Sequence, residues 1–176
     1  QEDPNPDNAH RYVYSSKSIE VETAKNPISR EKVVMVDAIN HALNEEMDLN
    51  PKMIIYGQDI ADPKGGVFTA TKGLSSKYGK DRVFNSPLAE SSIIGTAIGL
   101  AVTGYKPVVE IQFADYIWTS MMQIRNEVVT MRYRSNNLWE CPLIIRAPVG
   151  GYINGGIYHS QSIDGYFMHM PGILIA

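Results

Sequence analysis

The stretch VFNSPLAESSIIGTAIGLAVTGYKPVVEIQF, residues 83–113, carries the clearest indication of the fold class. It opens on a short strand candidate, 83–85, and continues into a helix candidate over 91–102 that is rich in small and apolar residues. It closes on a second strand candidate, 106–113. Strands that alternate with helices in this way predict an α/β domain with a mainly parallel sheet.

The flanking segments extend the same alternation. Apolar residues at helical spacing predict a helix from Val33 to Met47, and a short helix follows at 71–78. A long helix is expected over 116–134, with Ile117, Ile124 and Met131 on its apolar face. Apolar runs predict further strands at 52–57, at 143–146 and from Ile173 onward. Parallel sheets bind ligands outside the carboxyl ends of their strands, here near Gly57, 85–90, 113–116 and 147–162.

Composition narrows the class of protein. The 176 residues suit one domain, and 16 basic against 19 acidic residues give a net charge of −3, which does not favour nucleic-acid binding. No apolar run approaches the roughly 20 residues of a membrane span. The single cysteine, Cys141, excludes a disulfide framework and a multi-thiolate metal site, and favours a reducing, cytoplasmic location.

The two ends of the chain differ in character. Residues 1–30 are polar, contain Pro4, Pro6 and Pro27, and are predicted to be a linker or tail, whereas 31–176 are predicted to form the domain. The chain begins with Gln1 and stops on an apolar run, so we expect a segment of a longer protein whose domain is truncated at its C-terminus.

The candidate site residues each have two interpretations. Glu90 opens a helix, where the helix dipole favours a carboxylate, or it faces a ligand at a strand-to-helix switch. Tyr116 either packs in the core or stacks on a planar ring, and His159 is either a satisfied loop histidine or a functional one. The glycine-rich run 150–156 matches neither a phosphate-binding nor a dinucleotide-binding loop. The four histidines lie on separate segments without zinc-ligand spacing, so no metal site is expected.

Several long motifs, in order along 32–176, resemble one family. The motifs are 73–74, 77–90, 98–104, 110–116, 132–135 and 159–162. They are similar to the beta-subunit type of the thiamine diphosphate-dependent 2-oxoacid dehydrogenase decarboxylase component, closest to the branched-chain (2-oxoisovalerate) type. The resemblance implies a transketolase-like pyrimidine-binding domain, with helices on both faces of the sheet. It also implies the pyrimidine half of a site whose alpha-type half binds the diphosphate through Mg²⁺, either as a separate chain or fused ahead of this one.

The resemblance also assigns roles to residues. Glu90 corresponds to the glutamate that hydrogen-bonds a pyrimidine nitrogen and promotes loss of the thiazolium proton, and Tyr116 to the aromatic residue that packs on the pyrimidine. His159 corresponds to a histidine near the reacting carbon, a proton donor when the acyl group passes to lipoamide. Gln58 stands in the cofactor pocket where the family often has Glu.

The same resemblance implies partners and leaves the substrate open. The expected partners are the alpha-type half, further copies of the chain and a lipoyl-bearing acyltransferase. Pyruvate or acetoin remains an alternative to branched-chain 2-oxoacids, and a non-catalytic interaction module is the alternative from another class. The chain by itself is expected to have no turnover, because half of the site lies elsewhere.

Overall fold

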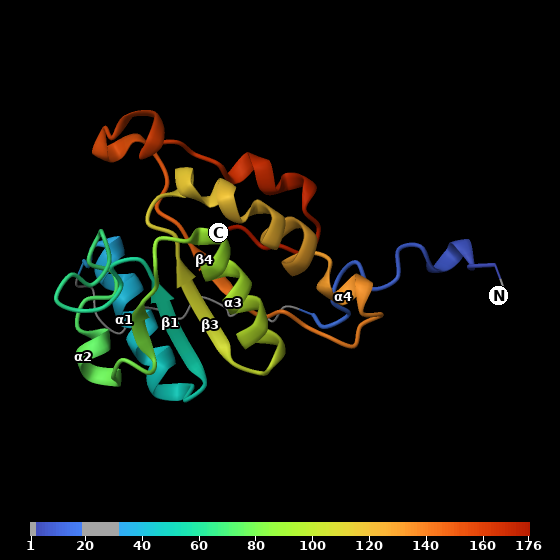
Figure 1. The fold of residues 1–176 in the computed structure, drawn as a ribbon, viewed down its shortest axis with the longest axis horizontal. Coiled ribbons are helices and arrows are strands. Elements are labelled where there is room, and N and C mark those ends of the chain that lie inside the picture. The colour runs from blue at the N-terminus through green and yellow to red at the C-terminus, as the bar shows by residue number, and fades with distance from the viewer. Residues whose placement is uncertain (1–2, 19–31) are drawn as a thin grey trace.

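A parallel sheet forms the centre of the computed structural model, which describes residues 3–18 and 32–176. Its strands are β1 (Met53–Gly57), β2 (Val83–Asn85), β3 (Lys106–Glu110) and β4 (Ile144–Arg146), in the order β2-β1-β3-β4. Gly57 is in register with Asn85 and Glu110, and Glu110 is in register with Arg146. All four carboxyl ends therefore meet at one edge of the sheet (Figure 1).

Helices cover both faces of this sheet, as predicted. Alternate strand residues point to opposite faces: Ile55 and Val108 pack with α1 (Met35–Leu49) and α2 (Leu74–Tyr78). Tyr56 and Val109 pack on the other face with α3 (Glu90–Val102) and the helical stretch after residue 113. Burying each large aliphatic side chain contributes about 1.5–3 kcal/mol, so the two apolar layers fix the position of the carboxyl edge.

Gly57 ends β1 where two backbones approach closely. A Cβ atom at this position would lie 2.4 Å from the carbonyl oxygen of Glu110 on the neighbouring strand. Only glycine therefore allows β1 to pair with β3 up to its last residue.

The predicted regular helix over 116–134 is wrong in its geometry and correct in its buried face. The stretch forms a 3-10 helix (Ala114–Ser120), a π-helix (Gln123–Val128) and the short α4 (Met131–Arg134). Ile117, Ile124 and Met131 are all buried. Hydroxyl groups compete with the regular backbone ladder, since Ser120 donates to the Ile117 carbonyl at 2.8 Å and Thr130 donates to that of Asn126.

The predicted fifth strand is also wrong. Residues 173–176 form no strand, and the described residues contain four strands. Ile173 packs beside the apolar cluster of the α3 face, while Leu174 is 79% exposed. A strand requires a hydrogen-bonded neighbour, and this segment has packed its apolar side chain on the core without one.

Smaller differences occur at the ends of the elements. The first helix begins at Met35, because Val34 has an extended backbone conformation (φ −79°, ψ 155°) and forms the N-cap. The helix expected at 71–78 begins at Leu74, after Gly73 in a left-handed conformation (φ 83°). The sheet pairing of β3 ends at Glu110 and does not reach Phe113.

The N-terminal residues 3–18 contain a short 3-10 helix, Pro6–Asn8, and an ion pair at 3.0 Å between Lys17 and Glu140. The assignment of 1–30 to a linker or tail stays a prediction, and its part at 19–31 lies outside the described residues. Within 3–18 and 32–176, the structure contains no helix with the length and apolarity needed to cross a membrane.

Candidate functional site

Gln58 and Glu90 form the first half of a polar cluster at the carboxyl edge. Gln58 directly follows β1 and is 2% exposed, and Glu90 is the first residue of α3, which follows β2 and its loop. Because β1 and β2 end side by side, the two side chains meet, and Gln58 Nε2 donates to Glu90 Oε1 at 2.9 Å. The first turn of α3 has no side-chain cap, so its dipole also favours the Glu90 carboxylate.

Tyr116 and His159 form the second half. The Tyr116 hydroxyl lies 2.7 Å from His159 Nε2, across 43 residues of sequence. The Phe113 ring meets His159 edge to face at 4.5 Å and Tyr116 at 5.6 Å. His159 Nδ1 lies 3.2 Å from the carbonyl oxygen of Gly155, so both ring nitrogens have partners.

Thr119 joins the two halves. Its hydroxyl lies 3.3 Å from Glu90 Oε2 and 3.3 Å from the Tyr116 carbonyl oxygen, one turn earlier in the same helix. The four predicted site residues are therefore brought together in one chain of contacts through Thr119. The long bond to Thr119 leaves Glu90 Oε2 the less firmly held of its two oxygens.

A buried ion pair supports the edge from within the sheet. Glu110 and Arg146 are register partners at the ends of β3 and β4, and their side chains form an ion pair in which Glu110 is 4% exposed. Burial raises the pKa of the Glu110 carboxyl, while the charge of Arg146 and its hydrogen bond act in the opposite direction. The pair fastens β4, and with it the loop that leads to His159, to the centre of the sheet.

The loop after Gln58 is held by two carboxylates. Asp59, in a left-handed conformation (φ 59°), pairs with Lys64 at 2.7 Å and accepts from Gln112 Nε2 at 2.8 Å. Asp62 accepts from the backbone N–H groups of Gly73 and Ser76 at the start of α2, at 2.7 and 2.9 Å. Desolvation acts to raise the pKa of Asp62, but these hydrogen bonds and those from the Ser75 and Ser76 hydroxyls outweigh it and lower the pKa to about 2.

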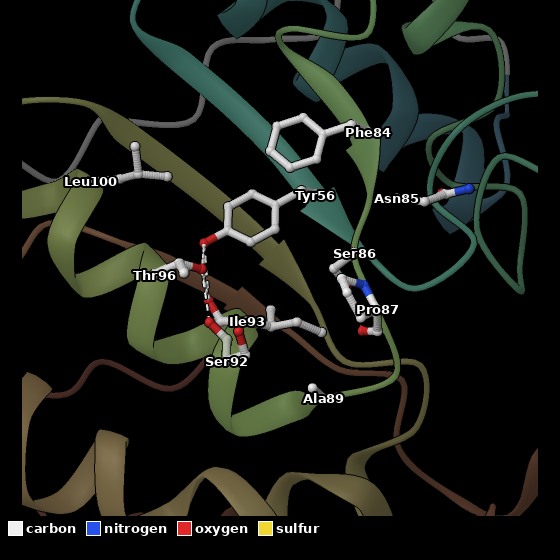
Figure 2. Close-up of a pocket in the computed structure, with 10 residues that line it drawn as sticks. All are labelled: Tyr56, Phe84, Asn85, Ser86, Pro87, Ala89, Ser92, Ile93, Thr96 and Leu100. Atoms are coloured by element: carbon white, nitrogen blue, oxygen red, sulfur yellow. Dashed lines mark hydrogen bonds between the residues drawn. The ribbon is translucent and has the colours of Figure 1, made fainter.

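The hollow beside α3 is a separate feature (Figure 2). It has a volume of about 270 Å³, and none of the four predicted site residues lines it. Its wall is the stacked pair Tyr56 and Phe84, with ring centroids 5.1 Å apart, and the Tyr56 hydroxyl donates to the Ile93 carbonyl at 3.0 Å. The Tyr56 hydroxyl on this wall is thus already paired, and the candidate site remains the cluster around Glu90.

Sequence reasoning missed Thr119, Phe113 and Gly155 as parts of this cluster. Thr119 had a usable signal, because it lies three residues after Tyr116 and shares its helical face. Gly155 had none, since its role depends on a contact with His159 that appears only in the fold. In the described residues, no three side chains of the metal-binding types gather into a metal site.

Fold and cluster together define an α/β domain with its polar site at the carboxyl edge of a parallel sheet. The chain belongs to the family described as "Transketolase, pyrimidine binding domain", whose model matches residues 31–176. It is 48% identical over 140 residues to a 2-oxoisovalerate dehydrogenase subunit beta of Bacillus subtilis, which covers 80% of this chain and 42% of that protein.

Other relatives agree with this assignment. A pyruvate dehydrogenase E1 component subunit beta of Bacillus subtilis is 40% identical, over 82% of this chain and 44% of that protein. A solved "Split gene transketolase, inactive beta4 tetramer" superposes with a TM-score of 0.54 at 25% identity, over 77% of this chain and 39% of that one. The chain thus spans about two fifths of the length of the relatives it matches.

Proposed function

We propose that this chain holds the pyrimidine ring of thiamine diphosphate in a 2-oxoacid dehydrogenase that decarboxylates branched-chain 2-oxoacids and passes the acyl group to lipoamide. The observation that carries the proposal is the Glu90 carboxylate, which Gln58 holds through Oε1 while Oε2 keeps only a 3.3 Å contact. The carboxylate has an oxygen with capacity to spare, and Thr119 links it to Tyr116, whose ring packs with that of Phe113. This combination suits an aminopyrimidine in both its polar and its aromatic parts.

Each residue has a stated task in this proposal. Glu90 binds a ring nitrogen and holds the proton exchanged there, Gln58 keeps Glu90 in place, and the Tyr116 ring packs against the pyrimidine. His159 supplies a proton during acyl transfer. The bound cofactor supplies the electron sink for loss of CO₂.

The rest of the site belongs to partners. The proposed partner is an alpha-type half that binds Mg²⁺ and the diphosphate, within an oligomer that contains further copies of this chain and meets a lipoyl-bearing acyltransferase. A cytoplasmic location is part of the same proposal. In this arrangement the chain alone binds the cofactor weakly and has no turnover.

The branched-chain substrate is favoured over pyruvate by the identities of 45–48% to 2-oxoisovalerate dehydrogenase beta subunits, against 40–43% for the pyruvate type. Rates of decarboxylation of 2-oxoisovalerate, pyruvate and acetoin by the complete enzyme test this choice. Faster turnover of pyruvate or acetoin would favour the alternative, a pyruvate or acetoin dehydrogenase. An interaction module without catalysis would turn over none of the three.

Glu90→Gln in the complete enzyme tests the central assignment. The amide keeps the shape of the side chain and removes its proton exchange, so we expect decarboxylation to fall at least about a hundredfold, within the range for positioned proton transfer. The melting temperature should stay nearly unchanged, because the helix-end contribution of the charge is only about 0.3–1 kcal/mol.

The direct measurement is proton–deuterium exchange at the thiazolium carbon of the bound cofactor, followed by NMR. Glu45→Gln, an exposed change on α1, is the matched control and should exchange like the unmodified enzyme. Equal exchange in Glu90→Gln would mean that Glu90 only stabilises the start of α3.

A further inference from the structure

We infer that Tyr116 and Gly155 are positioning residues for His159, which together hold it in one tautomer and one place. The inference rests on the proposed function for the reaction that His159 serves, but its geometry stands on the structure alone. It adds a task to Tyr116 that differs from packing on a ring, because it requires the hydroxyl group.

The hydrogen bonds around the imidazole decide its tautomer. The Gly155 carbonyl oxygen can only accept, so the contact at 3.2 Å requires a proton on His159 Nδ1. In the neutral ring Nε2 then has no proton and accepts from the Tyr116 hydroxyl at 2.7 Å. Tyr116 and Gly155 therefore fix which nitrogen of the His159 ring donates and which one accepts.

Gly155 leaves room for the His159 side chain because it has no side chain of its own. Gly155 has φ −82° and ψ 8°, a turn conformation with negative φ that does not require glycine, so no backbone demand explains the residue. A Cβ atom there would lie 2.5 Å from His159 Cβ. The Gly155 N–H donates to Ser160 Oγ at 2.7 Å, which holds the turn in the position that the histidine needs.

The Tyr116 hydroxyl serves both protonation states of the histidine. When Nε2 gains a proton, that N–H donates to the phenol oxygen, and the hydroxyl proton turns away. When Nε2 gives up the same proton, the hydroxyl donates to it again. Phe113, edge-on at 4.5 Å, closes one side of the ring, so the imidazole changes its proton without changing its place.

The first test reads the tautomer directly, by NMR of ¹⁵N-histidine in the complete enzyme with His159→Asn to assign its signals. We expect Nδ1 protonated and Nε2 unprotonated in the neutral form. Tyr116→Phe keeps the ring and removes the hydroxyl, and should lose the clean separation of the two nitrogen signals. The control Tyr158→Phe removes the hydroxyl of an exposed tyrosine that directly precedes His159 in the sequence, and should leave the spectrum unchanged. A protonated Nε2 in the unmodified enzyme, or an unchanged spectrum in Tyr116→Phe, would overturn the inference.

The second test adds a methyl group next to His159 and does not involve the Tyr116 hydroxyl. Gly155→Ala should displace His159 and shift its NMR signals, whereas Gly151→Ala, where nothing lies within 4 Å of the added Cβ, should not. In Tyr116→Phe, acyl transfer to lipoamide should fall about two- to tenfold, the effect of one neutral hydrogen bond, and by a larger factor than decarboxylation with an artificial acceptor.

The two proposals fail in different ways. If the unmodified enzyme decarboxylates no 2-oxoacid, the proposed function is wrong and the tautomer result still stands. If decarboxylation and transfer fall together in Tyr116→Phe, or if neither variant moves the His159 signals, the positioning role is wrong.

Discussion

The two halves of the site lie in different kinds of structure. Gln58 and Glu90 sit where a strand paired on both sides ends and where a helix with buried Ile93 and Ile94 begins. Tyr116 lies in a 3-10 helix, and His159 ends a loop in which residues 151–158 are all exposed. In Figure 1 this loop lies in the orange and red part of the chain, beyond the arrowheads of the strands.

The two halves differ in how easily they can move. Shifting Glu90 requires disruption of the apolar layers on the sheet, whereas shifting His159 breaks only a few hydrogen bonds and aromatic contacts. The first half is therefore suited to a fixed cofactor contact, and the second to a group that meets different molecules in successive steps.

Amide hydrogen exchange should show the largest contrast between the halves. The amides of Ile94 and Val109 are in the core and should exchange only through global unfolding, at a cost of about 5–15 kcal/mol. Amides in 151–158 should exchange far faster than those of the core, because all of these residues are exposed. Exchange measured by mass spectrometry on the complete protein checks this, and equal protection of both regions would show that the two halves are equally rigid.

Arg146→Met tests the ion pair with Glu110, which holds β4, and with it the loop that leads to His159, against the centre of the sheet. Removing one partner leaves Glu110 buried and unpaired, so we expect the free energy of unfolding to fall by about 3 kcal/mol. Without Arg146, burial raises the Glu110 pKa further. The loss should therefore be small in and below the ordinary Glu range and grow as the pH rises above it toward neutrality, because the folded state then holds an unfavourable charge.

Urea unfolding at acidic and neutral pH measures this effect. Arg125→Met changes an exposed arginine and is the matched control. A loss that does not depend on pH would show that Arg146 contributes through packing alone.

Asp62→Ala should have the smallest effect, confined to the rigid half. Its carboxylate caps α2 from the loop after Gln58, so we expect a loss of about 0.5–2 kcal/mol, as for other capping side chains. Because the folded-state pKa is lowered to about 2, this stabilisation is present above the ordinary Asp range and is lost as the pH falls toward 2.

Denaturation curves between pH 2 and 7 give the measurement, with exposed Asp81→Ala as the control. If both variants lose the same stability at neutral pH, the capping role of Asp62 is wrong.

The rigid half is also the half that sequence describes best. Short apolar runs bounded by glycine or proline placed the four strands correctly, and parallel strands implied that residues near Gly57, 85–90 and 113–116 would meet at one edge. The observed register confirms this edge. The prediction succeeded because it needed only the local sequence pattern and a general rule of sheet topology.

The other half could not be read in the same way. The contact of Tyr116 with His159 joins residues 43 apart, and no spacing in either segment encodes it. The 3-10 and π geometry of 114–128 arises in part from a hydroxyl-to-carbonyl bond, Ser120 to Ile117, that competes with the helix ladder after the apolar face has been fixed. Ile173 packs on the apolar cluster, as its side chain suggests, but it forms no strand, because no neighbouring strand of the described residues pairs with it.

The two crowded glycines differ in what a second mutation can repair. At Gly155 an added methyl group meets the Cβ atom of His159, and a compensating change elsewhere in this exposed loop can shift the two residues apart. At Gly57 it meets the carbonyl oxygen of Glu110, an atom that every residue carries. No suppressor at position 110 can relieve that clash, so inherited variation can reshape the loop that carries His159 while position 57 stays closed to it.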